Sequence, residues 1–121
     1  MTQILVVDDS DVIRRVAASL LVRMGFDVTE ATNGHEALEH CRARMPDAVL
    51  LDWQLPVMGS IEFLDAVRAE ADGDRPVVIY CTSEHDVEDI TRALNSGANE
   101  YLMKPFDRSA IETKLIECGL R

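Results

Sequence analysis

The stretch Gln3-Ile4-Leu5-Val6-Val7-Asp8-Asp9 decides the fold of this chain. Its first five residues form a short apolar run, which is typical of a strand buried on both faces of a parallel sheet. Similar runs recur along the chain, and one weaker segment alternates apolar and polar residues as an edge strand does. We therefore expect five strands, at residues 3–7, 27–31, 47–51, 76–81 and 100–103.

The segments between these runs have the apolar spacing of amphipathic helices. The first helix is expected to begin at Ser10 or Asp11 and to turn one stripe inward, made of Ile13, Val16, Ala17, Leu20 and Leu21. Capping residues and glycines predict four more helices. The second helix begins at Asn33-Gly34, the third runs from about Ser60 to Glu70, and the fourth begins at Ser83 or Asp86. The fifth begins at Asp107 and turns Ile111, Leu115 and Ile116 inward. Short loops between alternating strands and helices favour right-handed crossovers, and so one doubly wound α/β domain over residues 1–121.

Composition narrows the class of protein. The chain has 121 residues, of which 47% are hydrophobic, enough for a single core. No apolar run approaches the roughly 20 residues of a membrane helix, and the N-terminus lacks a signal-peptide pattern, so we expect a cytoplasmic protein without membrane insertion. The formal charge of −10 argues against direct nucleic-acid binding. The three cysteines, Cys41, Cys81 and Cys118, fit neither a disulfide framework nor a zinc site.

Polar residues follow four of the predicted strands. Asp8 and Asp9 follow the first strand, Asp52 the third, Thr82 the fourth and Lys104 the fifth. In open α/β sheets, ligands bind outside the carboxyl ends of the strands, so these residues are candidates for one site. Each alone is ordinary, because an Asp at a strand end is most often a turn former. Their combination on four strand ends is the informative feature.

The chemistry of this set points to a metal and a phosphoryl group. Three neighbouring carboxylates raise one another's pKa unless a cation joins them, and Mg²⁺ favours a few carboxylates plus water and phosphate oxygens. A carboxylate can also act as a nucleophile and form an acyl phosphate. Lys104 as a cation and Thr82 as a hydroxyl donor could then bind the phosphoryl oxygens.

Over nearly its whole length the sequence resembles the receiver domains of bacterial response regulators, especially the single-domain chemotaxis type. The matching segments are Ile4-Leu5-Val6-Val7-Asp8-Asp9-Ser10, Leu50-Leu51-Asp52-Trp53-Gln54-Leu55-Pro56-Val57-Met58 and Gly97-Ala98-Asn99-Glu100-Tyr101-Leu102-Met103-Lys104-Pro105-Phe106. The resemblance implies a flavodoxin-like five-stranded parallel sheet with strand order 2-1-3-4-5 and five helices.

The resemblance also implies roles for the residues of the metal site. Asp52 is then the phospho-acceptor and a metal ligand, Asp9 binds Mg²⁺ directly, Asp8 assists through water, and Gln54 adds its backbone carbonyl.

Other implied roles concern the switch. Thr82 is the switch hydroxyl, Tyr101 the switch aromatic and Lys104 the phosphate-reading cation, with a cis bond before Pro105. Phosphate on Asp52 draws Thr82 inward and Tyr101 turns into the vacated space, which reshapes the face of helix four, strand five and helix five.

The function implied is that of a stand-alone response regulator. It takes a phosphoryl group from a histidine kinase or a histidine phosphotransfer protein and then contacts a downstream protein target. It catalyses only its own phosphorylation and dephosphorylation, so it is not a turnover enzyme.

The turn after the acceptor departs from the family pattern. Receiver domains usually carry Met-Asp-Gly there, whereas this chain has Met58-Gly59-Ser60, in which Gly59 and Ser60 keep a flexible turn and supply a possible helix cap. Gln54 and Glu84 occupy positions that tune the access of water to the acyl phosphate in the family. The rates of phosphorylation and dephosphorylation stay open.

Two other functions remain alternatives at this point. One is a Mg²⁺-dependent phosphatase or phosphotransferase of the haloacid dehalogenase type, whose Asp-x-Asp motif Asp9-x-Asp11 would supply. The other is a degenerate receiver that binds partners without phosphorylation.

Several remaining polar residues and one aromatic have more ordinary interpretations. Arg14 and Arg15 are expected on a solvated helix face, or in a docking surface for a kinase. A surface or capping role is expected for His35, His40 and His85, and Trp53 is interpreted as a partly buried loop aromatic that could report on metal binding.

Overall fold

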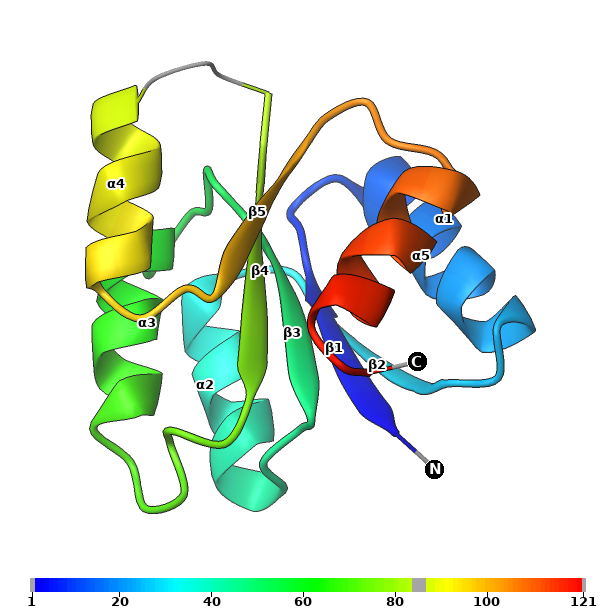
Figure 1. The fold of residues 1–121 in the computed structure, drawn as a ribbon. Helices are drawn as coiled ribbons and strands as arrows, with labels where there is room; N and C mark the ends of the chain where they lie inside the picture. Colours follow the sequence, from blue (N-terminus) through cyan, green and yellow to red (C-terminus); the bar gives the residue numbers. More distant parts are fainter. Residues whose placement is uncertain (1, 84–86, 121) are drawn as a thin grey trace.

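The computed structural model describes residues 2–83 and 87–120 of the chain. Strands and helices alternate through the described residues (Figure 1). In order they are β1 (Gln3–Val7), α1 (Asp11–Arg23), β2 (Asp27–Ala31), α2 (Gly34–Ala43), β3 (Ala48–Asp52), α3 (Ser60–Arg68), β4 (Val77–Thr82), α4 (Val87–Asn95), β5 (Glu100–Met103) and α5 (Arg108–Glu117). Ser10, Asn33 and Asp107 are the N-caps of α1, α2 and α5, so those three predicted helix starts are confirmed.

The strands form one sheet in the order β2-β1-β3-β4-β5, and all four pairings are parallel. The expected doubly wound, flavodoxin-like order is therefore confirmed. Helices α1 and α5 cover one face of the sheet, and α2, α3 and α4 cover the other (Figure 1).

Alternate residues of the strands fill two apolar layers. Leu5 and Val7 of β1 point toward the α2–α3 side, whereas Ile4 and Val6 point toward α1 and α5. All four side chains are at most 2% exposed. Because both faces of the sheet are covered, the central strands need continuous apolar runs, which explains why the sequence shows these runs without alternation.

The predicted inward faces of two helices are partly wrong. In α1, Ile13 and Val16 are exposed, and the buried face instead contains Ala17, Ala18, Leu21 and the charged Arg14. In α5, Ile111 and Leu115 are buried as expected, but Ile116 is exposed.

Element boundaries differ slightly from those predicted. β3 and β4 each begin and end one residue later, so Asp52 and Thr82 are the last residues of their strands. α3 ends at Arg68 and not at Glu70. Ser83 lies in a bend before α4, while Glu84, His85 and Asp86 fall outside the described residues. None of the described helices is long and apolar enough to cross a membrane.

Candidate functional site

Three carboxylates meet at the carboxyl edge of the sheet. Asp8, Asp9 and Asp52 each offer an oxygen atom, and these atoms all lie within 4.8 Å of one another. The register of β1 and β3 causes this, because Val7 pairs with Leu51 and the next residues of the two strands are Asp8 and Asp52. The predicted convergence of the carboxylates is confirmed.

Lys104 joins two of these carboxylates from the loop after β5. Its Nζ atom lies 2.9 Å from Oδ2 of Asp8 and 2.5 Å from Oδ1 of Asp52. All three side chains are largely buried, so water screens the ion pairs only weakly. The ammonium group therefore occupies one side of the acidic cluster.

The burial of the site changes two pKa values. Burial raises the pKa of Asp52 above its usual value, and although Lys104 opposes this change, the nearby Asp8 and Asp9 add to it. Burial alone would lower the pKa of Lys104, but its contacts with Asp52 and Asp8 hold it above the usual value. The amine thus stays protonated, and three carboxylates face one cation.

The donor set fits a hard divalent cation such as Mg²⁺, which prefers oxygen ligands and keeps several waters. Both oxygens of Asp8 are already engaged, Oδ1 by the Ser10 amide at 2.9 Å and Oδ2 by Lys104. Asp9, by contrast, is exposed to solvent. The two carboxylates therefore differ in exposure and in how far their oxygens are already engaged.

The remaining predicted site residues lie around the cluster. Thr82 is fully buried, and its carbonyl accepts a 2.8 Å hydrogen bond from the Lys104 amide. Gln54 is exposed two residues beyond Asp52. Tyr101 lies on β5, the edge strand of the sheet, and the residue is 38% exposed. Its ring centroid lies 5.3 Å from Nζ of Lys114. The peptide bond between Lys104 and Pro105 is cis, as expected.

The unusual turn after Asp52 does supply the helix cap. The N-cap of α3 is Gly59, one of the two residues expected there, and it makes no side-chain hydrogen bond. Ser60 is buried instead, and its hydroxyl donates to the backbone carbonyl of Asp52. A hydroxyl in place of the usual glycine thus ties the start of α3 to the acceptor residue.

The same loop packs against the start of α2. A Cβ atom on Gly34 would lie 2.3 Å from the backbone oxygen of Met58, so only glycine allows this close approach. Trp53 is half-buried against the same apolar layer, which confirms its interpretation as a partly buried loop aromatic.

Arg14 is the residue that sequence reasoning placed wrongly. It is buried, and it forms ion pairs with Asp11 at 2.7 Å and with Glu30 of β2 at 3.0 Å. Its spacing from Ala17 and Leu21 on one helix face was the available signal, together with acidic residues to pair with it. Arg15 is exposed, as expected.

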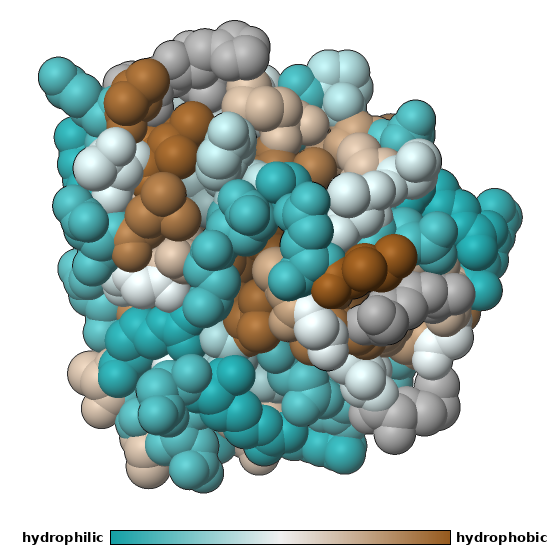
Figure 2. All heavy atoms as spheres, in the orientation of Figure 1, coloured by the Kyte–Doolittle hydropathy of each residue, from teal (hydrophilic) through white to brown (hydrophobic). Residues whose placement is uncertain are grey.

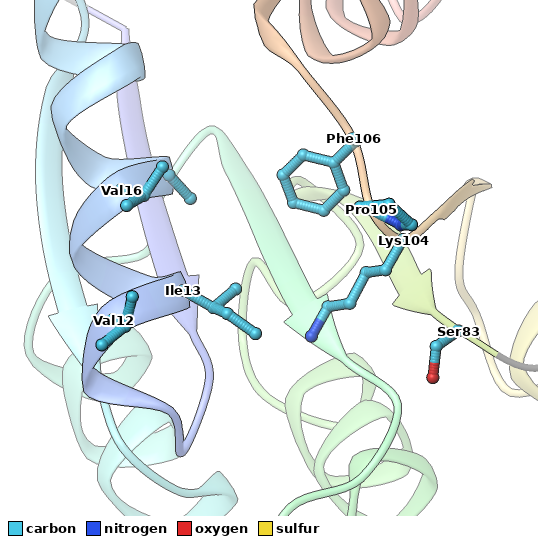
Figure 3. A pocket seen from close by; sticks show the side chains of 8 residues that line it. Val12, Ile13, Val16, Ser83, Lys104, Pro105 and Phe106 are labelled. Atoms are coloured by element: carbon cyan, nitrogen blue, oxygen red, sulfur yellow. The ribbon is translucent and has the colours of Figure 1, made fainter.

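A groove of about 430 Å³ opens beside the site (Figure 3). One wall is formed by Val12, Ile13 and Val16 of α1, and the other by the Lys104-Pro105-Phe106 loop. Lys104 extends from that loop toward α1 (Figure 3). The exposed apolar residues of α1 therefore border the acidic cluster.

This fold, with an acidic cluster and a lysine at the carboxyl edge, defines a receiver domain. The family of response regulator receiver domains matches residues 4–116, and the chain belongs to this family. Receiver domains of this kind are signalling proteins and not classical enzymes, and they interact with histidine kinases and downstream targets.

Known proteins of the family are similar over almost the whole chain. The chemotaxis protein CheY1 of Helicobacter pylori is 36% identical over 115 residues, which cover 93% of each chain. The CheY homolog of Campylobacter jejuni is also 36% identical, over 93% of this chain and 88% of its own.

Solved structures of related proteins have the same fold. Chemotaxis protein CheY4 of Vibrio cholerae superposes with a TM-score of 0.92 at 31% identity, covering 97% of this chain and 98% of its own. The receiver domain of a Pseudomonas aeruginosa sensor histidine kinase has a TM-score of 0.89 at 31% identity, covering 96% of this chain and 95% of its own. That structure holds a magnesium ion in its active-site cleft.

Proposed function

We propose that this chain is a cytoplasmic response regulator that accepts a phosphoryl group on Asp52 in a Mg²⁺-dependent reaction and signals through phosphorylation-dependent protein contacts. The observation that carries the proposal is the position of Asp52. Its carboxylate is buried at the end of β3, next to two other carboxylates and 2.5 Å from the Lys104 amine.

The proposed reaction transfers a phosphoryl group from a phosphohistidine. An oxygen of the Asp52 carboxylate attacks phosphorus, a P–O bond forms as the P–N bond breaks, and the leaving imidazole keeps the electron pair of that bond and takes up a proton from solvent. Lys104 already contacts Oδ1 of Asp52, which leaves Oδ2 as the attacking atom. The ammonium group also offers two further N–H donors to the phosphoryl oxygens.

Asp9, Asp52 and the backbone carbonyl of Gln54 would hold Mg²⁺, with Asp8 assisting through water. When bound, the ion neutralises charge on the phosphoryl oxygens. The excess of carboxylates over ammonium groups at the site, three against one, supports this part of the proposal. Asp8 contributes by holding Lys104 in position.

The output proposed is a switch of Thr82 and Tyr101. Thr82 moves toward the phosphoryl group and Tyr101 turns inward, which changes the face made by α4, β5 and α5. That face carries exposed apolar residues, among them Val87 and Leu94 of α4, and hydrophobic atoms run along α4 in Figure 2. The curated relatives named above are chemotaxis proteins, which supports a protein target in preference to DNA.

The phosphodonor proposed is a histidine kinase or a histidine phosphotransfer protein. The groove between α1 and the Lys104-Pro105-Phe106 loop lies beside the acidic cluster and is lined mainly by apolar side chains. Such a surface suits a helix that presents a histidine. The phosphatase alternative is weaker, because Asp11 lies in α1, paired with Arg14 and outside the carboxylate cluster.

Intact-mass measurement tests the proposal directly. The protein is incubated with Mg²⁺ and acetyl phosphate, and we expect one added phosphoryl group in the wild type and none in Asp52→Asn. The same measurement without Mg²⁺ should give little product. No adduct would favour the unphosphorylated binding module, an adduct that persists in Asp52→Asn would place the acceptor elsewhere, and turnover of unrelated phosphoesters would favour a phosphatase.

A further inference from the structure

Arg14 is a buried cation that touches the backbone of the metal site. The side chain is 7% exposed. Its Nη2 atom lies 2.7 Å from Oδ1 of Asp11, its Nε atom 3.0 Å from Oε1 of Glu30, and its Nη1 atom donates a 3.1 Å hydrogen bond to the carbonyl oxygen of Asp8. The guanidinium group is thus fixed by one carboxylate from α1 and one from β2. Its third contact is with the backbone of Asp8, a residue of the carboxylate cluster.

The carbonyl of Asp8 belongs to the peptide that leads into Asp9. The other polar groups of Asp8 are also held: its amide donates to the Ala31 carbonyl at 3.1 Å, and its carboxylate binds the Ser10 amide and Lys104. Arg14 completes this set by fixing the peptide plane between Asp8 and Asp9. The direction in which the exposed Asp9 side chain leaves the backbone follows from that plane.

We propose that Arg14 is a positioning residue for the metal site. Held by Asp11 and Glu30, it fixes the Asp8–Asp9 peptide so that the Asp9 carboxylate stays close to that of Asp52. The inference rests on the proposed function in one respect, since it takes the acidic cluster to bind Mg²⁺. Arg14 and its partners in α1 and β2 thus support Asp9 in addition to the contacts that hold the amide and carboxylate of Asp8.

Removing Arg14 removes both its charge and its contacts, and these two losses have opposite expected effects on Mg²⁺ affinity. A cation near an acidic cluster repels Mg²⁺, so loss of the charge alone strengthens Mg²⁺ binding. Loss of the support for the Asp8–Asp9 peptide weakens binding, and partners that orient metal ligands typically account for 10-fold to 100-fold in affinity. Arg15, the exposed neighbour, carries the same charge without the contacts and provides a matched control.

The test is a Mg²⁺ titration of wild type, Arg14→Met and Arg15→Met, followed by calorimetry and by the fluorescence of Trp53, the single tryptophan. We expect roughly tenfold weaker binding in Arg14→Met, and binding in Arg15→Met that is as tight as in the wild type or tighter. Equal or tighter binding in Arg14→Met would overturn the proposal. If the wild type itself binds no Mg²⁺, the proposed metal site fails as well, and the two failures are thereby distinguished.

A second readout needs no metal. In the metal-free protein, the amides of Asp9 and Ser10 should exchange with solvent faster in Arg14→Met than in Arg15→Met, because the peptide has lost its anchor. Circular dichroism checks that the variants fold. If Arg14→Met does not fold, Arg14→Lys is tested in its place, because lysine keeps the charge but lacks the planar guanidinium group. Weaker Mg²⁺ binding by Arg14→Lys supports the proposal, and wild-type affinity contradicts it.

Discussion

Asp52 shows how burial and function conflict in one residue. The side chain is 6% exposed and lies beside Asp8 and Lys104. Burial raises its pKa, so its ionised form is less favourable in the folded chain than in the unfolded chain. A nucleophilic carboxylate must be ionised to react, and the site therefore keeps Asp52 ionised at a cost in stability.

The first prediction concerns Asp52→Asn in metal-free buffer. Because the folded pKa of Asp52 lies above the unfolded value, its contribution to stability is fully present below the reference pKa of 3.8 and is lost as the pH rises through the folded pKa. The amide cannot ionise, and Lys104 keeps its ion pair with Asp8, so the variant should be more stable than the wild type at pH 7.

Urea denaturation at a series of pH values measures this difference, which should shrink toward zero near pH 4. Asp65→Asn, at an exposed carboxylate of α3, is the control and should show no such gain at pH 7. A wild type more stable than Asp52→Asn at pH 7 would contradict the prediction.

Val57 is strained in the loop after the acceptor. Its φ is 68°, a left-handed conformation that β-branched residues rarely adopt. The Met58 amide donates a 2.8 Å hydrogen bond to the Pro56 carbonyl, so Val57 is the central residue of a γ-turn. The side chain is 81% exposed and so adds little packing in return.

The second prediction is that Val57→Asn raises the free energy of unfolding by about 1 kcal/mol, because asparagine tolerates positive φ. Val57→Thr keeps the branched Cβ and should show no gain. Thermal and urea unfolding of the three proteins provide the measurement, and equal stability of the two variants would refute the strain argument.

At the scale of elements, α4 is attached less firmly than its neighbours. Among its described residues only Ala93 is buried. The hydroxyl of the buried Tyr80 donates a 2.8 Å hydrogen bond to Asp89 in the first turn of α4, and it also lies 3.4 Å from the Trp53 carbonyl. Tyr80 thus connects α4 to the loop that follows the acceptor.

The third prediction is that Tyr80→Phe loosens α4. Loss of this hydrogen bond should lower the free energy of unfolding by about 1 kcal/mol, and amide hydrogen exchange should accelerate in α4 more than in α1 or α2. Tyr101→Phe, at an exposed ring, is the matched control. Unchanged exchange in α4 would mean that other contacts hold this helix.

At the scale of the whole molecule, the parallel sheet gathers residues that are far apart in sequence. Lys104 contacts Asp8 across 96 positions and Asp52 across 52. Since the site exists only in the folded chain, any ion that binds it stabilises the fold.

The fourth prediction follows from this linkage. Mg²⁺ at 100 times its dissociation constant should raise the free energy of unfolding by about 2.7 kcal/mol. Asp9→Asn should lose most of this gain, because Asp9 is the exposed carboxylate of the cluster. Urea unfolding with and without Mg²⁺, at matched ionic strength, measures this gain in the free energy of unfolding. The same gain in Asp9→Asn would exclude Asp9 as a ligand.

Local signals in the sequence were sufficient for much of the fold and for the composition of the site. The local signals are apolar runs, capping side chains such as Asn33 and glycines after helices, and each acts on its immediate neighbours. The boundaries of most strands and helices could therefore be predicted to within a residue or two. The carboxyl ends of parallel strands meet at one edge, and the sequence therefore also predicted that Asp8, Asp9, Asp52 and Lys104 converge. The roles of Thr82 and Tyr101 in switching stay predictions.

Which side chains are buried and how the site residues are held depends on tertiary packing. Packing of α1 on the rest of the fold buries Arg14 and leaves Ile13 exposed. The partner Glu30 comes from another element, and Ser60 reaches the Asp52 carbonyl only after the loop has folded back. The local patterns of the sequence were enough to predict which charged residues meet at Asp52. The contacts that hold those residues in place come from packing between distant segments, which no local pattern encodes.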